Sequence, residues 1–212
     1  MKWRKKLLAI VKPKLDSLDV AHRTDHSLRN YKICETICKS HKKADLAILY
    51  AACLLHDIGK INKTHNEHSH ESVKLAEQIL NKTKFPKDKI PLVLKIIKEH
   101  DNYRWVLNHS NHRPKDLEAK IFQDADRIES LGAIGIGRNF IWGGRYDKVM
   151  WNKNIEFKPR IIYGGNISVL HTLDFELSAY KHLNTEAAKK IAKNRYLFIK
   201  LFIKQFIKEW NS

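Results

Sequence analysis

The spacing of apolar residues constrains the fold of this chain more than any other feature of its sequence. Along almost all of its 212 residues, apolar side chains recur every three to four positions, which is the period of an amphipathic α-helix. Convincing runs of alternating apolar and polar residues, which are typical of strands, are absent. Thr24 and Thr185 stand where they are expected to cap two of the helices. We therefore predict an all-α fold, with helices over residues 2–17, 25–40, 43–58, 69–82, 87–100, 115–129, 131–142, 169–182 and 185–210.

The domain organisation follows from the absence of any linker between these helices. We predict a single helical domain over residues 1–212, with its core in 20–130 and with C-terminal helices in 169–210 that pack on this core. Residues 143–168 are different, because they are rich in glycine and aromatic residues and lack periodicity. We expect an irregular insertion there, which is a long connection, a lid or a small hairpin.

The charge of the chain is strongly positive, with a formal net charge of +17. Most of this charge comes from single lysines at helical spacing, and no arginine-rich arm or aromatic-interleaved basic stripe is present. This distribution favours a solvated basic surface, or a small anionic substrate, over direct binding of nucleic acid, which is kept as the less favoured alternative.

The cysteine count and the lengths of the apolar runs indicate a compartment. Cys34, Cys38 and Cys53 give an odd number in a chain without an export signal, and no run reaches the roughly 18 apolar residues of a membrane span. We predict a reducing, cytoplasmic location without a membrane partner. Cys34 and Cys38 lie one helical turn apart and are interpreted as core residues, not as half of a metal site.

The last predicted helix has an unusual composition. In RYLFIKLFIKQFIKEW, lysines recur at Lys200, Lys204 and Lys208, while most other positions are apolar. A narrow polar stripe on a broadly hydrophobic helix predicts burial on more than one side. Packing against the rest of the domain accounts for this pattern, and a homodimer interface is the alternative.

The chemistry of the chain is indicated by the stretch LLHDIGK at 54–60. There, His56 and Asp57 end a buried-looking apolar helix, and an imidazole beside a carboxylate is costly at such a place without compensation. A divalent metal ion would compensate for this cost, because imidazole nitrogen and carboxylate oxygen are both good metal ligands. His26 and Asp126 are the natural completions of such a site. Helix capping by His26, or an ion pair of Asp126 with a neighbouring arginine, are the alternatives.

Several motifs together resemble the HD superfamily, and most closely its stand-alone metal-dependent phosphohydrolases from bacteria and archaea. They are AHRTDHSLR, LLHDIGK, DADRIESLGAIGIGR and, towards the end, HTLDFELSAY and LNTEAAKKIAKNR, so that the resemblance covers nearly the whole chain. It implies an HD-type helical bundle and the metal ligands His26, His56, Asp57 and Asp126. One position departs from the pattern, because Arg23 stands where relatives tend to carry an acidic residue.

Further polar residues are candidates for catalysis and substrate binding. The resemblance places His68 and His100 where relatives with two ions hold the second one; contact with substrate phosphate, proton transfer or an ordinary surface role are the alternatives. Asp57 is the candidate for orienting the attacking water. Candidates for neutralising phosphate charge are Lys60, Arg29 and Arg127, each of which can instead form a structural ion pair.

The function implied is hydrolysis of a phosphoanhydride or phosphoester in a small phosphorylated substrate, with nucleotides as the indicated class. The cofactor is one divalent ion (Mn, Fe, Co, Ni, Zn or Mg), with a second ion as an alternative. Two alternative hypotheses within the enzyme class are a nucleotide monophosphatase and a phosphodiesterase. From a different class comes a basic nucleic-acid-binding or regulatory module with a non-catalytic metal site.

Overall fold

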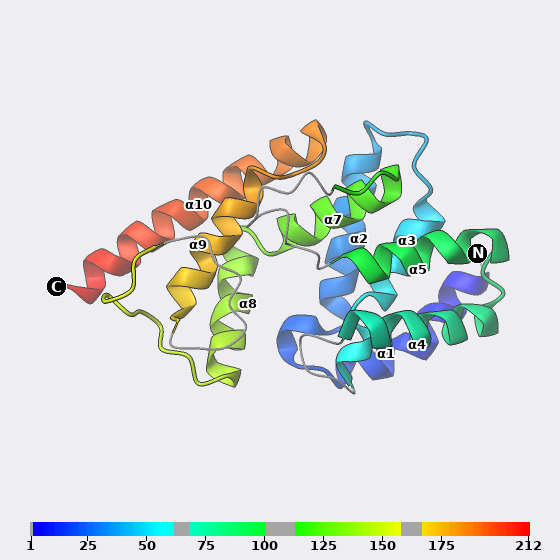
Figure 1. Ribbon diagram of the computed structural model, residues 1–212, viewed down its shortest axis with the longest axis horizontal. Coiled ribbons are helices and arrows are strands. Elements are labelled where there is room, and N and C mark those ends of the chain that lie inside the picture. Colours follow the sequence, from blue (N-terminus) through cyan, green and yellow to red (C-terminus); the bar gives the residue numbers. More distant parts are fainter. Residues whose placement is uncertain (1, 62–67, 101–112, 158–166) are drawn as a thin grey trace. The chain divides into compact units, whose positions relative to one another are not determined.

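The computed structural model describes residues 2–61, 68–100, 113–157 and 167–212, and within them all regular structure is helical (Figure 1). This confirms the all-α prediction. None of the described helices is both long and apolar enough to cross a membrane. The elements are α1 (Lys2–Asp16), η1 (Val20–His22), α2 (Thr24–Cys38), α3 (Leu46–Leu55), η2 (Ile58–Ile61), α4 (His68–Thr83), η3 (Lys87–Lys89), α5 (Ile90–Glu99), α7 (Leu117–Glu129), α8 (Gly132–Arg145), α9 (Val169–Tyr180) and α10 (Glu186–Trp210), where η marks a short 3₁₀-helix.

The packing divides the chain into two compact units. The first unit contains α1 to α5 and the part of α7 that ends at Ala125; the second contains the remainder of α7 with α8, α9 and α10. The single domain over 1–212, with a core in 20–130, stays a prediction.

Helix α3 is the centre of the first unit. Its sequence, LAILYAACLL, is almost wholly apolar, and every residue from Ile48 to Leu55 is buried. It packs against α1, α2, α4 and α5, so from Ile48 to Leu55 it has no solvent-facing side that would require polar residues. The three cysteines are free and buried, which agrees with the core interpretation of Cys34 and Cys38. His56 and Asp57, which follow Leu55, therefore lie buried at the end of this central helix.

The two predicted N-caps have different outcomes. The Thr185 hydroxyl accepts a hydrogen bond from the Ala188 backbone at 3.2 Å and caps α10, as predicted. The prediction for Thr24 is wrong, because Thr24 is already helical and the cap position is Arg23, whose side chain makes no capping bond. The carboxylate of Asp16, from the end of α1, instead accepts from the Thr24 backbone N–H at 3.2 Å. A residue of the preceding helix therefore satisfies this helix end.

In the second unit, α8, α9 and α10 pack on one another (Figure 1). The predicted end of α8 near residue 142 is three residues early, since the helix continues through Gly143 and Gly144 to Arg145. A Cβ on Gly143 would lie 2.4 Å from Val169 Cγ2, so this glycine permits close packing and does not break the helix. The chain is irregular over 146–157, which agrees with part of the predicted insertion; residues 158–166 lie outside the described residues.

Candidate metal centre

Five polar residues of the first unit are buried at the ends of its helices. His26 lies in the first turn of α2, His56 and Asp57 follow α3, His68 begins α4, and His100 follows α5. None of the five is more than 5% exposed. Because buried ionisable groups are costly unless they are compensated, this concentration at one place calls for a ligand or a charge partner.

The tautomer of His56 is fixed by its hydrogen bond. Nδ1 donates to the Cys53 carbonyl at 2.9 Å, so in the neutral ring Nε2 carries a lone pair. This Nε2 lies 3.2 Å from His26 Nε2 and 3.3 Å from Asp57 Oδ2. Asp57 Oδ2 is also 3.7 Å from His26 Nε2. Three ligand atoms of the kinds that bind divalent ions therefore face one another.

The separations between these atoms fit one metal ion. Nitrogen and oxygen ligands bind zinc-like ions at about 2.1 Å, so two of them lie roughly 3.0 Å apart at a right angle and roughly 3.4 Å apart at the tetrahedral angle. The observed distances of 3.2, 3.3 and 3.7 Å lie around these values. His26, His56 and Asp57 can thus hold an ion with little movement.

A second group shares the Asp57 carboxylate. His100 Nδ1 donates to the Ile97 carbonyl at 2.6 Å, which leaves the Nε2 lone pair 3.3 Å from His68 Nε2. Asp57 Oδ1 lies 3.5 Å from His68 Nε2 and 3.8 Å from His100 Nε2. Each oxygen of Asp57 therefore faces one pair of histidines, and both groups have the spacing of a metal site.

Asp57 is held in its ionised form. Burial raises the pKa of its carboxyl, but the adjacent His56 ring and the Lys60 ammonium outweigh burial and hold the pKa well below its usual range. Lys60 Nζ lies 2.8 Å from Asp57 Oδ1. The carboxylate is thus available as an anionic ligand at neutral pH.

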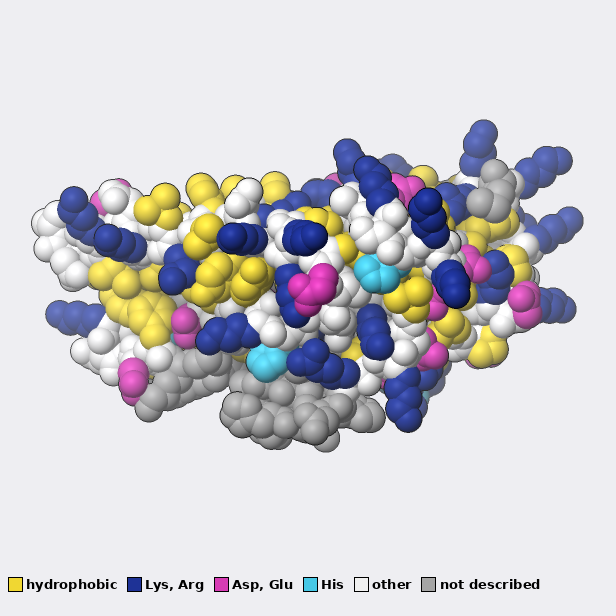
Figure 2. Space-filling view, turned by 90° about the horizontal axis from the view of Figure 1, so that it is seen from above, with side chains coloured by type: hydrophobic (Ala, Val, Ile, Leu, Met, Phe, Trp, Pro, Cys, Tyr) yellow, Lys and Arg dark blue, Asp and Glu magenta, His cyan; other side chains and the backbone are white. Residues whose placement is uncertain are grey.

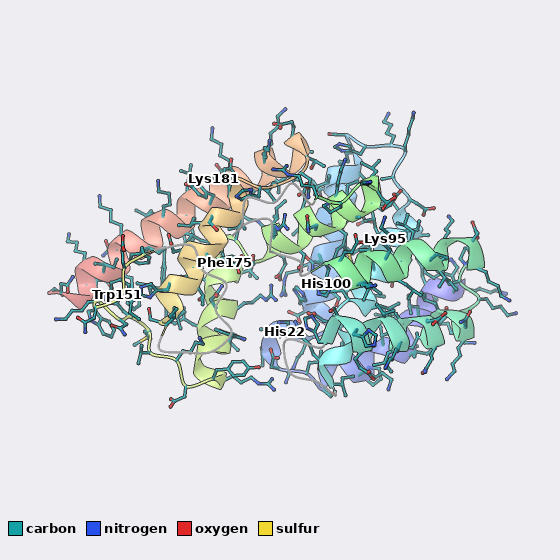
Figure 3. The ribbon with its side chains drawn as sticks, viewed as in Figure 1. His22, Lys95, His100, Trp151, Phe175 and Lys181 are labelled. Atoms are coloured by element: carbon teal, nitrogen blue, oxygen red, sulfur yellow. The ribbon has the colours of Figure 1, made fainter. Side chains whose placement is uncertain are left out.

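His22 is a further imidazole beside this group that the sequence-based selection of site residues omitted (Figure 3). Its Nδ1 donates to the Asp19 carboxylate at 2.8 Å, and its ring centroid lies 6.0 Å from that of His26. The signal was present in AHRTDH, because His22 and His26 are four residues apart.

Helix α7 adds an apolar wall to the site. The Phe122 ring lies 5.3 Å from the His56 ring and 6.4 Å from the His100 ring. Asp126 follows one turn later on the same helix face, is half-buried, and belongs to the second unit. Its role as a ligand stays a prediction.

The two candidate arginines have different surroundings. Arg127 is 2% exposed and lies within α7, whereas Arg29 lies at the surface of α2 in an ion pair with Asp25. The substrate-binding roles of both arginines stay predictions.

The end of α7 is fixed by polar contacts within the second unit. Ser130 Oγ donates to Glu176 at 2.6 Å, and Arg195 donates to the Ile128 carbonyl at 2.9 Å. Glu129 also forms an ion pair with Arg138. Burial raises the pKa of Glu176 to about 7, so this carboxyl changes its charge near neutral pH.

Known proteins resemble the chain in sequence and in fold. The family model HD domain matches residues 23–131, just over half of the chain. Over 97 residues, the chain is 31% identical to YpgQ, an uncharacterized protein of Bacillus subtilis, and the match covers 45% of this chain and 42% of YpgQ. The matched region thus spans less than half the length of that relative.

Three solved structures resemble the fold over nearly the whole chain. A Lactobacillus plantarum protein has a TM-score of 0.81 at 22% identity, covering 99% of this chain and 97% of its own. An HD-superfamily hydrolase of Bacillus thuringiensis has a TM-score of 0.69 at 28% identity, covering the same shares. Bacillus subtilis YpgQ, solved in complex with ADP, has a TM-score of 0.70 at 24% identity and covers 97% of both chains.

Proposed function

Because the chain belongs to the HD domain family, we propose that it is a metal-dependent phosphohydrolase whose substrate is a small phosphorylated molecule, namely a nucleotide. The observation that carries this proposal is the buried Asp57 carboxylate, which has two imidazoles facing each of its oxygens. The hydrolase from Bacillus thuringiensis supports the reaction class, and the ADP complex of YpgQ supports nucleotides.

The ion is held by His26, His56 and Asp57, with Asp126 as the fourth ligand. Imidazole and carboxylate together suit Mn, Fe, Co, Ni or Zn better than Mg, which prefers oxygen ligands alone. A bound divalent ion supplies Lewis-acid chemistry, since it makes water a better nucleophile and withdraws electron density from a phosphoryl oxygen.

The side chains of this chain then have distinct tasks. The ionised Asp57 orients the attacking water by accepting its hydrogen bond. Lys60, whose ammonium is 2.8 Å from Asp57, neutralises part of the charge on the phosphate. His68 and His100 either hold a second ion or contact the phosphate and transfer a proton, and the metal-to-protein ratio distinguishes these two roles.

The test is a turnover assay over a panel of nucleotides and phosphorylated metabolites with Mn, Co or Ni. We expect the wild type to hydrolyse at least one compound, and the double variant His56→Ala, Asp57→Ala to lose both bound metal and turnover. His70→Ala is the matched control, because His70 is exposed on α4 beside the buried His68. If the wild type is no faster than the double variant on every compound, the enzymatic proposal fails.

The same samples decide the main alternative. A basic module with a non-catalytic metal site would bind RNA or DNA in a salt-sensitive gel shift and show no metal-dependent turnover. Metal analysis by mass spectrometry provides an independent measurement. A folded wild type that retains no divalent ion would contradict the ligand assignment, whatever the substrate.

A further inference from the structure

The solvent-facing side of α10 carries exposed leucines between lysines. Steps of three and four residues align five side chains along the helix, and we call them the outer stripe: Lys193, Leu197, Leu201, Lys204 and Lys208. Leu197 is 50% exposed and Leu201 is 62% exposed, and Phe198 beside them is 46% exposed. Figure 2 looks onto this helix and shows hydrophobic and basic side chains intermixed along it.

The outer stripe lies opposite the face that α10 uses for packing. Ala188, Ala192 and Ile199 are buried where α10 meets α8 and α9, about half a turn away from Leu197 and Leu201. The exposed leucines are therefore not needed for the fold of the second unit. The sequence-based explanation of the apolar helix, packing on the rest of the domain, accounts for Ile199 but not for these leucines.

The charge of this face is not balanced by acidic residues. Helix α10 contains seven basic and two acidic residues, Glu186 and Glu209. Glu186 pairs with Lys189, and Glu209 accepts a hydrogen bond from Gln205. Among the described residues, no ion pair joins the three lysines of the outer stripe to a carboxylate. The face is complementary to an anionic partner that also accepts aliphatic side chains.

We propose that the outer stripe of α10 binds the surface of an anionic lipid bilayer. Leucine and phenylalanine enter the boundary between headgroups and acyl chains, while the flanking lysines extend their ammonium groups to lipid phosphates. Such a helix lies in the plane of the interface, so it needs no spanning segment. The expectation of no membrane partner depended on the absence of such a segment, and this proposal replaces it.

Other occupants fit the face less well. A two-fold pairing with a second copy would bring the lysines of one outer stripe beside those of the other, which is repulsive. Nucleic acid would use the lysines but gain nothing from the aliphatic Leu197 and Leu201. A helix face is convex and offers no pocket for a peptide, whereas a fluid lipid surface conforms to it.

The experiment is sedimentation of the full chain with vesicles of phosphatidylcholine alone and with vesicles that also contain phosphatidylglycerol. We expect the protein to sediment only with the anionic vesicles. Lys204→Gln, Lys208→Gln weakens partitioning by about 25-fold, from about fivefold for each lysine. Leu197→Gln, Leu201→Gln weakens it by about tenfold. The matched control is Lys42→Gln, Lys43→Gln, an equal loss of charge at exposed positions in the first unit.

Each other outcome overturns the proposal. No sedimentation with anionic vesicles removes it directly. A loss with the lysine variant but not with the leucine variant shows general charge attraction without insertion. A dimer in light scattering that the leucine variant dissociates shows that a second copy covers the face. Circular dichroism confirms that the variants fold, and their metal-dependent turnover in solution should equal that of the wild type, since α10 contains none of the proposed ligands.

Discussion

The close approach of Gly59 to α4 provides a sharp test of how the fold positions the candidate site. The Gly59 backbone N–H donates to Ser72 Oγ at 2.9 Å, and a Cβ on Gly59 would lie 2.4 Å from the His68 carbonyl oxygen. It would also lie 2.5 Å from the Ser72 backbone nitrogen. Both clashes involve backbone atoms, so Gly59→Ala forces α4 and η2 apart by about 1 Å, the difference from an ordinary contact of roughly 3.5 Å.

This displacement is large compared with the tolerance of a binding site. His68 Nε2 lies 3.5 Å from Asp57 Oδ1, and active groups must be held within about 0.5 Å of their working positions. We therefore expect Gly59→Ala to lose about 1–3 kcal/mol of the free energy of unfolding through overpacking. We also expect turnover of the substrate found in the panel to fall by about 100-fold.

Urea unfolding and initial rates with saturating metal measure the two effects. Gly137→Ala is the control, because a Cβ on Gly137 in α8 meets nothing within 4 Å. It should stabilise the helix by about 1 kcal/mol and leave turnover unchanged. If Gly59→Ala unfolds at the wild-type urea concentration and retains the wild-type rate, the tight packing of η2 on α4 does not position His68.

Three further predictions concern charged groups. Metal chelation should lower the unfolding temperature of the wild type but not that of the ligand double variant, because the ion binds only the folded state. Hydrogen bonds from Lys12 and from the Thr24 backbone lower the pKa of Asp16 to about 2. Asp16→Ala should therefore cost about 1 kcal/mol at pH 7 in urea unfolding, and the difference should vanish as the pH falls from 3.8 through 2. Burial raises the pKa of Glu176, so the stabilisation from its protonated carboxyl is fully present below pH 4.5 and is lost as the pH rises through about 7. In urea unfolding, the free energy of unfolding of Glu176→Gln should therefore rise relative to that of the wild type over this pH range, by at most about 3 kcal/mol.

The helices were predictable because their signal is local. The apolar run before His56 indicated a buried helix, and its neighbours within ten residues determine that pattern. The boundary errors come from contacts with residues outside the helix concerned. Thr24 was expected to cap α2, but Asp16 from another helix accepts from its backbone. The helix over 131–142 was expected to end before Gly143, but Gly143 lies within α8 against Val169.

The same distinction, between local sequence signals and contacts formed by packing, applies to the candidate site. The HD pair and its motifs named His26, His56, Asp57, His68 and His100, and all five lie together at the ends of helices in the first unit. His22 was overlooked although it stands four residues before His26, because that spacing alone does not show that the ring is buried. Its hydrogen bond to Asp19 and its ring contact with His26 appear only once η1 is folded against α2.

The helical class, the family and the residue types available for metal binding could all be predicted from the sequence, since they depend on periodicity and on short motifs. Three features are visible only in the folded chain: Asp57 faces two histidine pairs, Gly59 permits the approach of α4, and α10 leaves leucines exposed between lysines. They could not be predicted because distances between residues on different helices are set by how the helices pack. A difference of about 1 Å, which decides whether ligand atoms share an ion, leaves no trace in the local pattern of residues.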